Sequence, residues 1–427
     1  MNADSFHRLA KVLADSGEAE TIEDAQATLS SYGVRILLNP SFEGDVAAQI
    51  IALTVINCAS RSFMGNVKIE TSCDTVLTAP GFAGSSLSDF SGWVGVNPKL
   101  DEQAHQWPVI EIGALSSPLI GEAIHPWADG WIFGINGQTK VQGALFPPAC
   151  VAAGGLAVSE AFSILRRDNP YAGRRALMLS LWDPRKVGRT AEVGPVVDSE
   201  VPSIWLIGLG HLGQAYAWTI GFMSPTHDAT LFLQDVDDIT SSTPSTSVLS
   251  TSNLIQHRKT RIVAAWLEAR GYKTALVERQ FDQFQRIGAT EPRVALFGVD
   301  NPAARRVFEG AGFSHIIDAG LGSGYRDFKA IRIRTFPGPS RAADLWAANV
   351  DAPDIVKAPA YKALLASGAD PCGVTTLATR SVGAPFVGCV GAGYVIAALI
   401  RRKLGLDSFA VVDLNLRDPA ACDALLA

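Results

Sequence analysis

Three glycines near the middle of the chain have the spacing of a phosphate-binding turn. Residues 204–213 read IWLIGLGHLG, so an apolar run ends in Gly208, Gly210 and Gly213. In a GxGxxG turn between a strand and a helix, the first glycine permits the tight turn, the second lets the backbone approach a phosphate, and the third lets helix and strand pack closely. The unpaired N–H groups of the following helix attract an anion. The pattern predicts a nucleotide-binding unit that begins near residue 200.

Three charged residues follow this turn at spacings that suit a bound nucleotide. Asp235 ends the next predicted strand, about 20 residues after the last glycine, where a carboxylate binds the two ribose hydroxyls. Lys259 opens a predicted helix, and Asp300 ends a further predicted strand. A carboxylate at the carboxyl end of a parallel strand faces the ligand crevice, and magnesium near phosphates is held by one or two carboxylates. The glycines and Asp235 fit NAD and ATP equally well, whereas Lys259 and Asp300 favour ATP with Mg²⁺.

The elements that position these residues occur twice in the chain. VRILL at 34–38, a turn, a helical stretch and NVKIE at 66–70 give the same strand, turn, helix and strand order as the segment that starts at residue 203. The segments 146–167 and 384–405 share a proline, Cys-Val-x-Ala-Gly and a long apolar helix that ends in two arginines. These two repeated patterns favour a duplicated α/β unit, with the polar segment 183–203 as the linker.

The remaining segments carry weaker signals. Thr21 is a predicted N-cap, and Gly33 is the predicted C-cap of the same helix. Residues 72–98 are rich in Gly and Ser and are predicted to be mostly loop, while 336–373 contains five prolines and is expected to cross the surface with short helices.

Composition excludes several classes of protein. The chain has 427 residues, a formal net charge of −6 and no long basic run, which argues against a nucleic-acid partner. No stretch gives a clean prediction of a membrane span, and the first residues are too polar and acidic for a signal peptide. The six cysteines form no CxxC pair, which argues against a zinc ribbon or a redox dithiol. We expect reduced thiols in a cytoplasmic protein with no membrane partner.

The second half resembles the MoeB/ThiF family and the ubiquitin-activating enzymes over roughly residues 200–406. The resemblance rests on GLGHLG, on DVD at 235–237, on Lys259 and on VDN at 299–301, in that order along the chain. DAGLGSGYRD at 318–327 and the closing helix PFVGCVGAGYVIAALIRR are also similar to that family. The resemblance implies that Asp235 holds the ribose of ATP, that Lys259 binds its phosphates and that Asp300 holds Mg²⁺.

The resemblance also gives the first half a role. Ubiquitin-activating enzymes contain two adenylation folds, one of which has lost its site. The expected fold class is therefore α/β, with two Rossmann-like ThiF/MoeB-type adenylation folds in tandem: a degenerate one at 1–190 and an active one at 200–427. The two would form an internal pseudo-dimer, and a homodimer of the whole chain stays open.

Two parts of the family pattern are missing. The family's Asn-x-x-Arg-Gln is replaced by STPSTSVL, which has no arginine, and its paired zinc cysteines are absent. Arg258, Arg261 and Arg305 are the candidates to replace the missing arginine. In the family, an early helix of the partner half lends an arginine to the nucleotide, and Arg8 is the only arginine in the first helical stretch of this chain.

Cys372 is the candidate for a catalytic thiol. It lies in DPCGVTTLA, after the proline-rich excursion and before the closing helix, where ubiquitin-activating enzymes carry Pro-x-Cys-Thr. The motif is shifted, so a structural cysteine stays open, and Thr375, Thr376 or no residue would then accept the acyl group. Cys150 and Cys389 share the Cys-Val-x-Ala-Gly setting, which is typical of packing residues.

The resemblance implies an activating enzyme for a ubiquitin-like protein with a C-terminal glycine, similar to those of bacterial ubiquitination-like systems, some of which are linked to antiviral defence. Its other partner would be a conjugating enzyme. Three alternatives stay open: a MoeB/ThiF-type sulfur-carrier or peptide adenylyltransferase without a thioester step, an NAD-dependent oxidoreductase, and an inactive scaffold. ATP–pyrophosphate exchange would support either adenylation hypothesis, and NAD binding would support the oxidoreductase.

Overall fold

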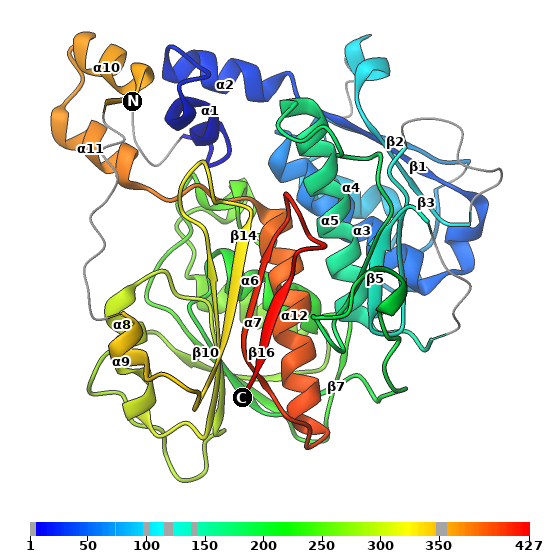
Figure 1. The fold of residues 1–427 in the computed structure, drawn as a ribbon, viewed down its shortest axis with the longest axis vertical. Helices are drawn as coiled ribbons and strands as arrows, with labels where there is room; N and C mark the ends of the chain where they lie inside the picture. Colours follow the sequence, from blue (N-terminus) through cyan, green and yellow to red (C-terminus); the bar gives the residue numbers. More distant parts are fainter. Residues whose placement is uncertain (1–5, 73, 97–101, 115–122, 138–142, 347–356) are drawn as a thin grey trace.

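The computed structural model describes residues 6–72, 74–96, 102–114, 123–137, 143–346 and 357–427. The chain is a mixed α/β protein whose strands gather into two separate groups (Figure 1). The strands of residues 33–181 make up the N-terminal half, and those of residues 200–427 make up the C-terminal half.

The C-terminal half is built on an eight-stranded sheet. In sheet order its strands are β11 (Lys273–Val277), β10 (Thr230–Gln234), β8 (Ile204–Ile207), β12 (Val294–Phe297), β13 (His315–Leu321), β14 (Ala330–Phe336), β15 (Phe409–Asn415) and β16 (Asp423–Leu426). The first five run parallel to one another, and each later strand is antiparallel to its neighbour. The strand order reverses at β8, so the carboxyl ends of β8, β10 and β12 meet at a topological switch point, where α/β sheets bind ligands.

The N-terminal half has strands of the same directions in the same order. Strands β2 (Val67–Glu70), β1 (Val34–Leu38) and β3 (Val109–Ile112) are parallel. Strands β4 (Pro126–Asp129), β5 (Ile132–Ile135) and β6 (Leu177–Ser180) form an antiparallel meander. A parallel bridge between Ile110 and Ile124 joins these three parallel strands to the meander. The order β2-β1-β3 followed by β4-β5-β6 therefore corresponds to β10-β8-β12 followed by β13-β14-β15.

Two long helices pack against each other where the halves meet. Helix α5 (Pro147–Arg166) of the N-terminal half lies beside α12 (Pro385–Lys403) of the C-terminal half (Figure 1). A Cβ atom on Gly155 would lie 2.7 Å from the Phe386 carbonyl oxygen, and one on Gly393 would lie 2.8 Å from the Pro148 carbonyl oxygen. The helices therefore approach so closely that only glycine fits at these positions. Both helices are also long and apolar enough to cross a membrane, but 89% and 83% of their apolar windows are buried inside the fold, as in core helices.

An aromatic cluster forms a second contact between the halves. Trp93 of α4 (Leu87–Val94) stacks on Trp218 of α6 (His211–Ile220) and on Trp266 of α7 (Lys259–Glu268), with ring centroids 6.4 and 5.7 Å apart. Trp218 Nε1 also donates to Thr54 Oγ1 of α3 (Val46–Ser62) at 3.1 Å. The N-terminal half thus covers the helices that flank the predicted nucleotide turn.

Four helices form a cap that joins the start of the chain to its proline-rich excursion. This helical cap consists of α1 (Ala10–Ser16), α2 (Ile22–Ser30), α10 (Pro359–Ala366) and α11 (Pro371–Thr379) (Figure 1). Lys11 pairs with Asp15, Asp15 accepts from the Tyr361 hydroxyl, and Lys11 Nζ donates to the Ala378 carbonyl at 2.8 Å. These buried polar bonds fix α10 and α11 on α1. The other elements are short: α8 (Pro302–Val307), α9 (Ala342–Leu345), β7 (Glu200–Val201) and β9 (Ser224–Pro225).

The structure corrects some of the local predictions. Thr21 caps α2, because its side chain accepts from the Asp24 N–H, but the predicted C-cap at Gly33 is wrong. The helix already ends at Ser30, and Gly33 lies under the Trp107 ring, where a Cβ atom would come within 2.3 Å. The segment 72–98, predicted to be mostly loop, contains α4, which begins with a capping box formed by Ser86 and Asp89. Cys372 is the second residue of α11, because Asp370 caps that helix and Pro371 opens it.

A lysine of the C-terminal half is buried in the N-terminal half. Lys329, just before β14, is 0% exposed, and its Nζ donates to the Ser159 carbonyl and to Ser163 Oγ on α5. Burial lowers the pKa of Lys329 to about 8, against the opposing effect of Asp168 and Glu160. Between this value and the ordinary pKa near 10.5, the unfolded chain binds a proton that the folded chain has released. The contribution of Lys329 to stability therefore rises as pH rises through that window.

We predict that Lys329→Met removes this pH dependence. The free energy of unfolding of the wild type, minus that of Lys329→Met, should increase between pH 8 and pH 10.5 by up to about 3 kcal/mol. Urea unfolding at several pH values measures the difference, and Lys273→Met, at an exposed ion pair with Asp228, is the control. A difference that stays constant with pH would contradict the burial of an uncharged amine.

Candidate active site

The glycine turn is built as its spacing predicts. Gly208, at the end of β8, has a φ of +82°, which an L side chain rarely adopts. A Cβ atom on Gly213 would lie 2.0 Å from the Gly208 carbonyl oxygen, so helix α6 packs directly on the turn. Gly210 is the N-cap of α6 and offers no side-chain hydrogen bond, and a Cβ atom there would meet nothing within 4 Å. The start of α6 is therefore uncapped and open, as an approaching phosphate requires.

Asp235 is held against this turn from the end of β10. Its Oδ2 accepts from the Leu209 N–H at 2.6 Å, and its Oδ1 accepts from the Asp237 N–H at 2.8 Å. The half-buried carboxylate thus braces the turn, while carboxylate oxygens have further lone pairs for ribose hydroxyls. Asp237 pairs with Lys259 Nζ at 2.8 Å. Lys259 is the first residue of α7, and this ion pair places its ammonium beside the end of β10.

Asp300 is the free carboxylate at this edge of the sheet. It is exposed just beyond β12, and within the described ranges its side chain makes no hydrogen bond or ion pair. Its neighbour Asn301 caps α8 by accepting from the Ala303 N–H. Because β8, β10 and β12 are parallel neighbours, their ends bring Asp300, Asp235 and the glycine turn to the same edge. In the described part of the chain no three His, Cys, Asp or Glu side chains cluster, so a magnesium ion here would need phosphate oxygens as further ligands.

The three arginines proposed to replace the family's missing arginine are all engaged elsewhere. Arg305 binds the buried Asp318 at 2.9 Å and the Ala319 carbonyl. Arg261 binds Glu278 at 3.0 Å, and Arg258 donates to the Val236 carbonyl. Of the three, only Arg258 stays beside the Asp235–Asp238 loop, through a 3.3 Å contact with Asp238.

Arg8 reaches the C-terminal half from the first residues of the chain. Its guanidinium donates to the Ser381 carbonyl at 3.0 Å, and its backbone N–H donates to Ser245 Oγ at 3.4 Å. Ser245 belongs to the polar stretch that stands where the family carries its arginine. The segment 381–384, which we call the junction segment, also bonds through the Val382 N–H to the Ser323 carbonyl. Arg8 therefore lies close to the loops that follow β10 and β13.

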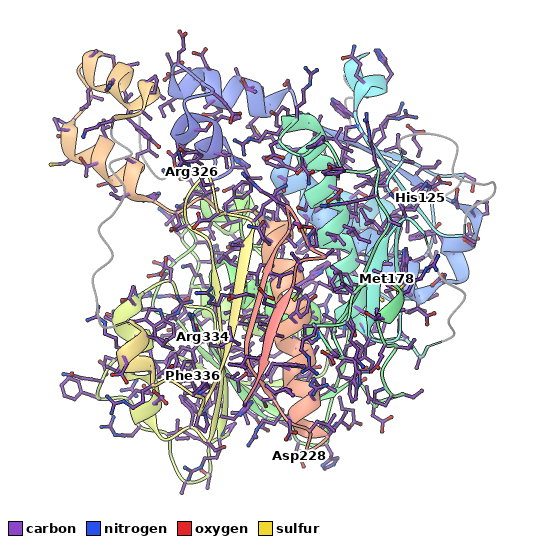
Figure 2. All side chains as sticks on the ribbon, viewed as in Figure 1. His125, Met178, Asp228, Arg326, Arg334 and Phe336 are labelled. Carbon is purple, nitrogen blue, oxygen red and sulfur yellow. The ribbon has the colours of Figure 1, made fainter. Side chains whose placement is uncertain are left out.

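Sequence reasoning missed two residues near this edge. His211, the first residue of α6, lies 2.8 Å from the Ala384 carbonyl oxygen through its Nε2, and burial lowers the pKa of His211 to about 4. The neutral ring therefore joins the glycine turn to the junction segment. Arg326 is exposed in the turn between β13 and β14, near the helical cap (Figure 2). The only signal for Arg326 was its place in DAGLGSGYRD, and for His211 its place inside the glycine motif.

Cys372 is an exposed thiol at the start of α11, while Cys58, Cys150 and Cys389 are buried. The Sγ atoms of Cys58 and Cys389 lie 3.5 Å apart between α3 and α12. Burial raises the pKa of the Cys150 thiol, in keeping with a packing role. Nine residues of helix span about 13 Å, so the thiol lies roughly that far from the junction segment at the other end of α11. Cys73 lies outside the described residues.

The N-terminal half has a cavity at the corresponding place, but its chemistry differs. The cavity encloses about 330 Å³ at the starts of α3 and α5 and is lined by Asp45 and Asp129. Asp45 Oδ1 accepts from the Ala48 N–H at 3.0 Å, so a carboxylate of the chain caps α3 where α6 is open. Burial raises the pKa of Asp129. The cavity thus has two carboxyl groups in its lining, and one of them already satisfies a backbone N–H at the start of α3.

We predict opposite effects for two glycines of the turn. Gly213→Ala forces a methyl group against the Gly208 carbonyl and should lower the free energy of unfolding by roughly 1–3 kcal/mol. Gly210→Ala meets open space and should unfold like the wild type, but its methyl group lies where a phosphate approaches, so ATP binding should weaken. Thermal unfolding and calorimetric titration with ATP measure the two effects. If Gly210→Ala bound ATP with wild-type affinity, the turn would not be part of the binding site.

Comparison with known proteins gives matches to both halves. The family model of the BilD C-terminal domain matches residues 201–406, and that of the BilD N-terminal domain matches residues 33–181. The bacterial E1-like protein BilD of Collimonas sp. (strain OK412) is 36% identical over 422 residues, which cover 95% of this chain and 90% of that protein.

Solved structures give more distant matches. E. coli MccB matches with 12% identity and a TM-score of 0.37, over 71% of this chain and 92% of MccB. The structure of MccB with MccA-N7isoASN matches with 14% identity and a TM-score of 0.35, over 53% of this chain and 64% of that chain.

Proposed function

The chain belongs to the BilD family of bacterial E1-like proteins, and we propose that it uses ATP to activate the C-terminal carboxylate of a ubiquitin-like protein. In this reaction a carboxylate oxygen of the C-terminal glycine attacks the α-phosphorus of ATP. The bond between the α- and β-phosphates breaks, pyrophosphate leaves, and an acyl adenylate forms.

The observation that carries the proposal is the open start of α6 beside a free carboxylate. Gly210 leaves the helix uncapped and accessible, and Asp300 has no partner within the described ranges. Positive partial charge at the helix start attracts phosphate, and an unpaired carboxylate at the same edge suits Mg²⁺. This combination favours a nucleoside triphosphate with magnesium over NAD, whose pyrophosphate needs no such carboxylate.

Each residue of the site has a role in this proposal. Asp235 holds the ribose, and Lys259 turns from Asp237 toward the phosphates. Asp300 holds Mg²⁺, which neutralises charge that develops on the phosphates. Arg8 takes the place of the missing arginine, because it is the one candidate bound to the junction segment and to the polar stretch after β10.

We further propose that residues 1–190 are a degenerate adenylation fold and that residues 200–427 are the active one. The matching strand order of the two halves supports a common architecture. The capping of α3 by Asp45 supports the loss of nucleotide binding, because the carboxylate occupies the position of an anion. The N-terminal half then supports the active half through α5 and supplies Arg8.

The second step of the proposal is a thioester on Cys372. The thiolate attacks the acyl carbon of the adenylate, AMP leaves, and the thioester passes the acyl group to a conjugating enzyme. The exposure of Cys372 at the start of α11 supports this step, because an acyl adenylate and a partner protein can both reach the thiol. The thiol lies about one helix length from the junction segment, so α11 must move to bring the thiol to the adenylate. The same distance favours the alternative of an adenylyltransferase that stops at the adenylate. Cytoplasmic residence and a further homodimer remain proposals from the sequence.

We predict that Asp300→Ala lowers the rate of ATP–pyrophosphate exchange by 100-fold or more while the protein still folds. The reason is the loss of the carboxylate that holds magnesium, at a position where no bond of the fold depends on it. The assay uses the purified ubiquitin-like protein, and Asp198→Ala, an exposed aspartate of the linker, is the control. Exchange at the wild-type rate in Asp300→Ala would contradict the assignment.

We predict that Cys372→Ala abolishes a covalent adduct with the ubiquitin-like protein but retains pyrophosphate exchange, because adenylation precedes thiol attack. Gel electrophoresis with and without reducing agent detects the adduct, and Cys422→Ala is the control at a half-buried cysteine. An adduct that persists in Cys372→Ala would point to Thr375 or Thr376. A wild type that exchanges pyrophosphate without any adduct would favour the adenylate-only alternative.

A further inference from the structure

A second polar cluster lies at the edge of the sheet that carries the site. It consists of Gln234, the last residue of β10, with Arg279 and Gln285 from the segment after β11. Gln234 and Gln285 are 1% and 2% exposed. Gln234 Nε2 lies 3.3 Å from the Arg279 carbonyl oxygen and 3.5 Å from Gln285 Oε1, and Arg279 Nη2 donates to Gln285 Oε1 at 2.6 Å. None of these contacts has a role in the proposed reaction.

One atom of this cluster has no partner. Gln234 Oε1 is buried and accepts no hydrogen bond from the described residues. A buried acceptor without a donor is costly, and such atoms are rare in folded proteins. The atom therefore marks a place where a ligand that brings a donor would gain more than it does at the surface.

The contacts of the amide fix which of its atoms is unpaired. A guanidinium only donates, so the atom of Gln285 that faces Arg279 is its oxygen. The atom of Gln234 that faces this oxygen and the Arg279 carbonyl must then be the donor, Nε2. A flipped amide would set oxygen against two oxygens. The unpaired atom of Gln234 is thus an acceptor.

The position of Gln234 relates it to the base of a nucleotide. Asp235, the next residue, braces the glycine turn and is assigned to the ribose. Successive side chains at a strand end point to opposite faces, so Gln234 lies on the face of β10 that also carries Phe232, which packs on Trp205. Because β11 is the parallel neighbour of β10, Arg279 lies at the same edge. A base joined to a ribose at Asp235 thus lies beside the end of the strand that carries Gln234.

We propose that Gln234 Oε1 accepts a hydrogen bond from the exocyclic amino group of adenine and is the residue that selects the base. Hypoxanthine and guanine carry a carbonyl oxygen at this position, which would face Oε1 with no proton between the two atoms. Unsubstituted purine offers no donor and leaves the acceptor unpaired. The inference rests on the proposed use of ATP and adds the residue that distinguishes adenine from other purines.

Calorimetric titration of the full chain with three nucleotides tests this proposal without any turnover. The ligands are ATP, purine riboside triphosphate and inosine triphosphate, each with Mg²⁺. The wild type should bind ATP roughly 10-fold or more tightly than purine riboside triphosphate, and inosine triphosphate should bind more weakly still. Gln234→Met, which keeps the length of the side chain but lacks the acceptor, should bind ATP and purine riboside triphosphate with equal affinity. Gln283→Met, an exposed glutamine of the same segment, should retain the wild-type preference.

The outcomes separate this inference from the proposed function. Equal affinity of the wild type for ATP and purine riboside triphosphate would overturn the role of Gln234 and leave ATP use intact. A full ATP preference in Gln234→Met would do the same. If no nucleotide binds to the wild type, both the proposed function and this inference fail. Should Gln234→Met not fold, the wild-type series alone still decides, because it needs no variant.

Discussion

The close contact of α5 with α12 is the constraint on which the arrangement of this protein depends. Gly155 and Gly393 let each helix touch the backbone of the other, and no larger residue fits without a shift of one half. The aromatic cluster around Trp93 and the buried Lys329 add to the same interface. Interiors packed at this density transmit a displacement rather than absorb it. The two halves therefore hold each other in one relative position.

That fixed position brings residues from the start of the chain against the C-terminal half. Arg8 precedes α1 and reaches the junction segment of the C-terminal half, and Lys11 in α1 binds the last turn of α11. Residues 8–11, at the start of α1, thus contact both the junction segment and the helix that carries Cys372. The buried pair of Lys11 and Asp15 gives little net stability, because burial lowers the pKa of Lys11 and raises that of Asp15. Its effect is to fix how α10 and α11 pack on α1.

The helices that follow the first strand of each half differ in their capping residue. At α6 the N-cap is Gly210, and the helix start is open, whereas at α3 the N-cap is Asp45, whose carboxylate already satisfies a backbone N–H. Both helix starts carry positive partial charge, and at α3 the carboxylate of the capping residue already lies against it. The difference in proposed function between the halves thus follows from local chemistry at helix ends.

The sequence alone was enough for features that depend on neighbours along the chain. The glycine turn, the strand-end positions of Asp235 and Asp300, and the helix-opening Lys259 follow from local spacing, because a strand, a tight turn and a helix start each need particular residues within a few positions. Local patterns were misleading where a distant contact prevailed, as at Gly33, which lies under Trp107 instead of capping a helix. Only the tertiary structure decided which partners the polar groups have: Arg305 is bound to Asp318, Arg8 extends to Ser381, and Gln234 Oε1 finds no donor among the described residues. The physical reason is that these hydrogen bonds and ion pairs join residues from different elements, 13 positions apart for Arg305 and Asp318 and 373 for Arg8 and Ser381, and burial sets their strength.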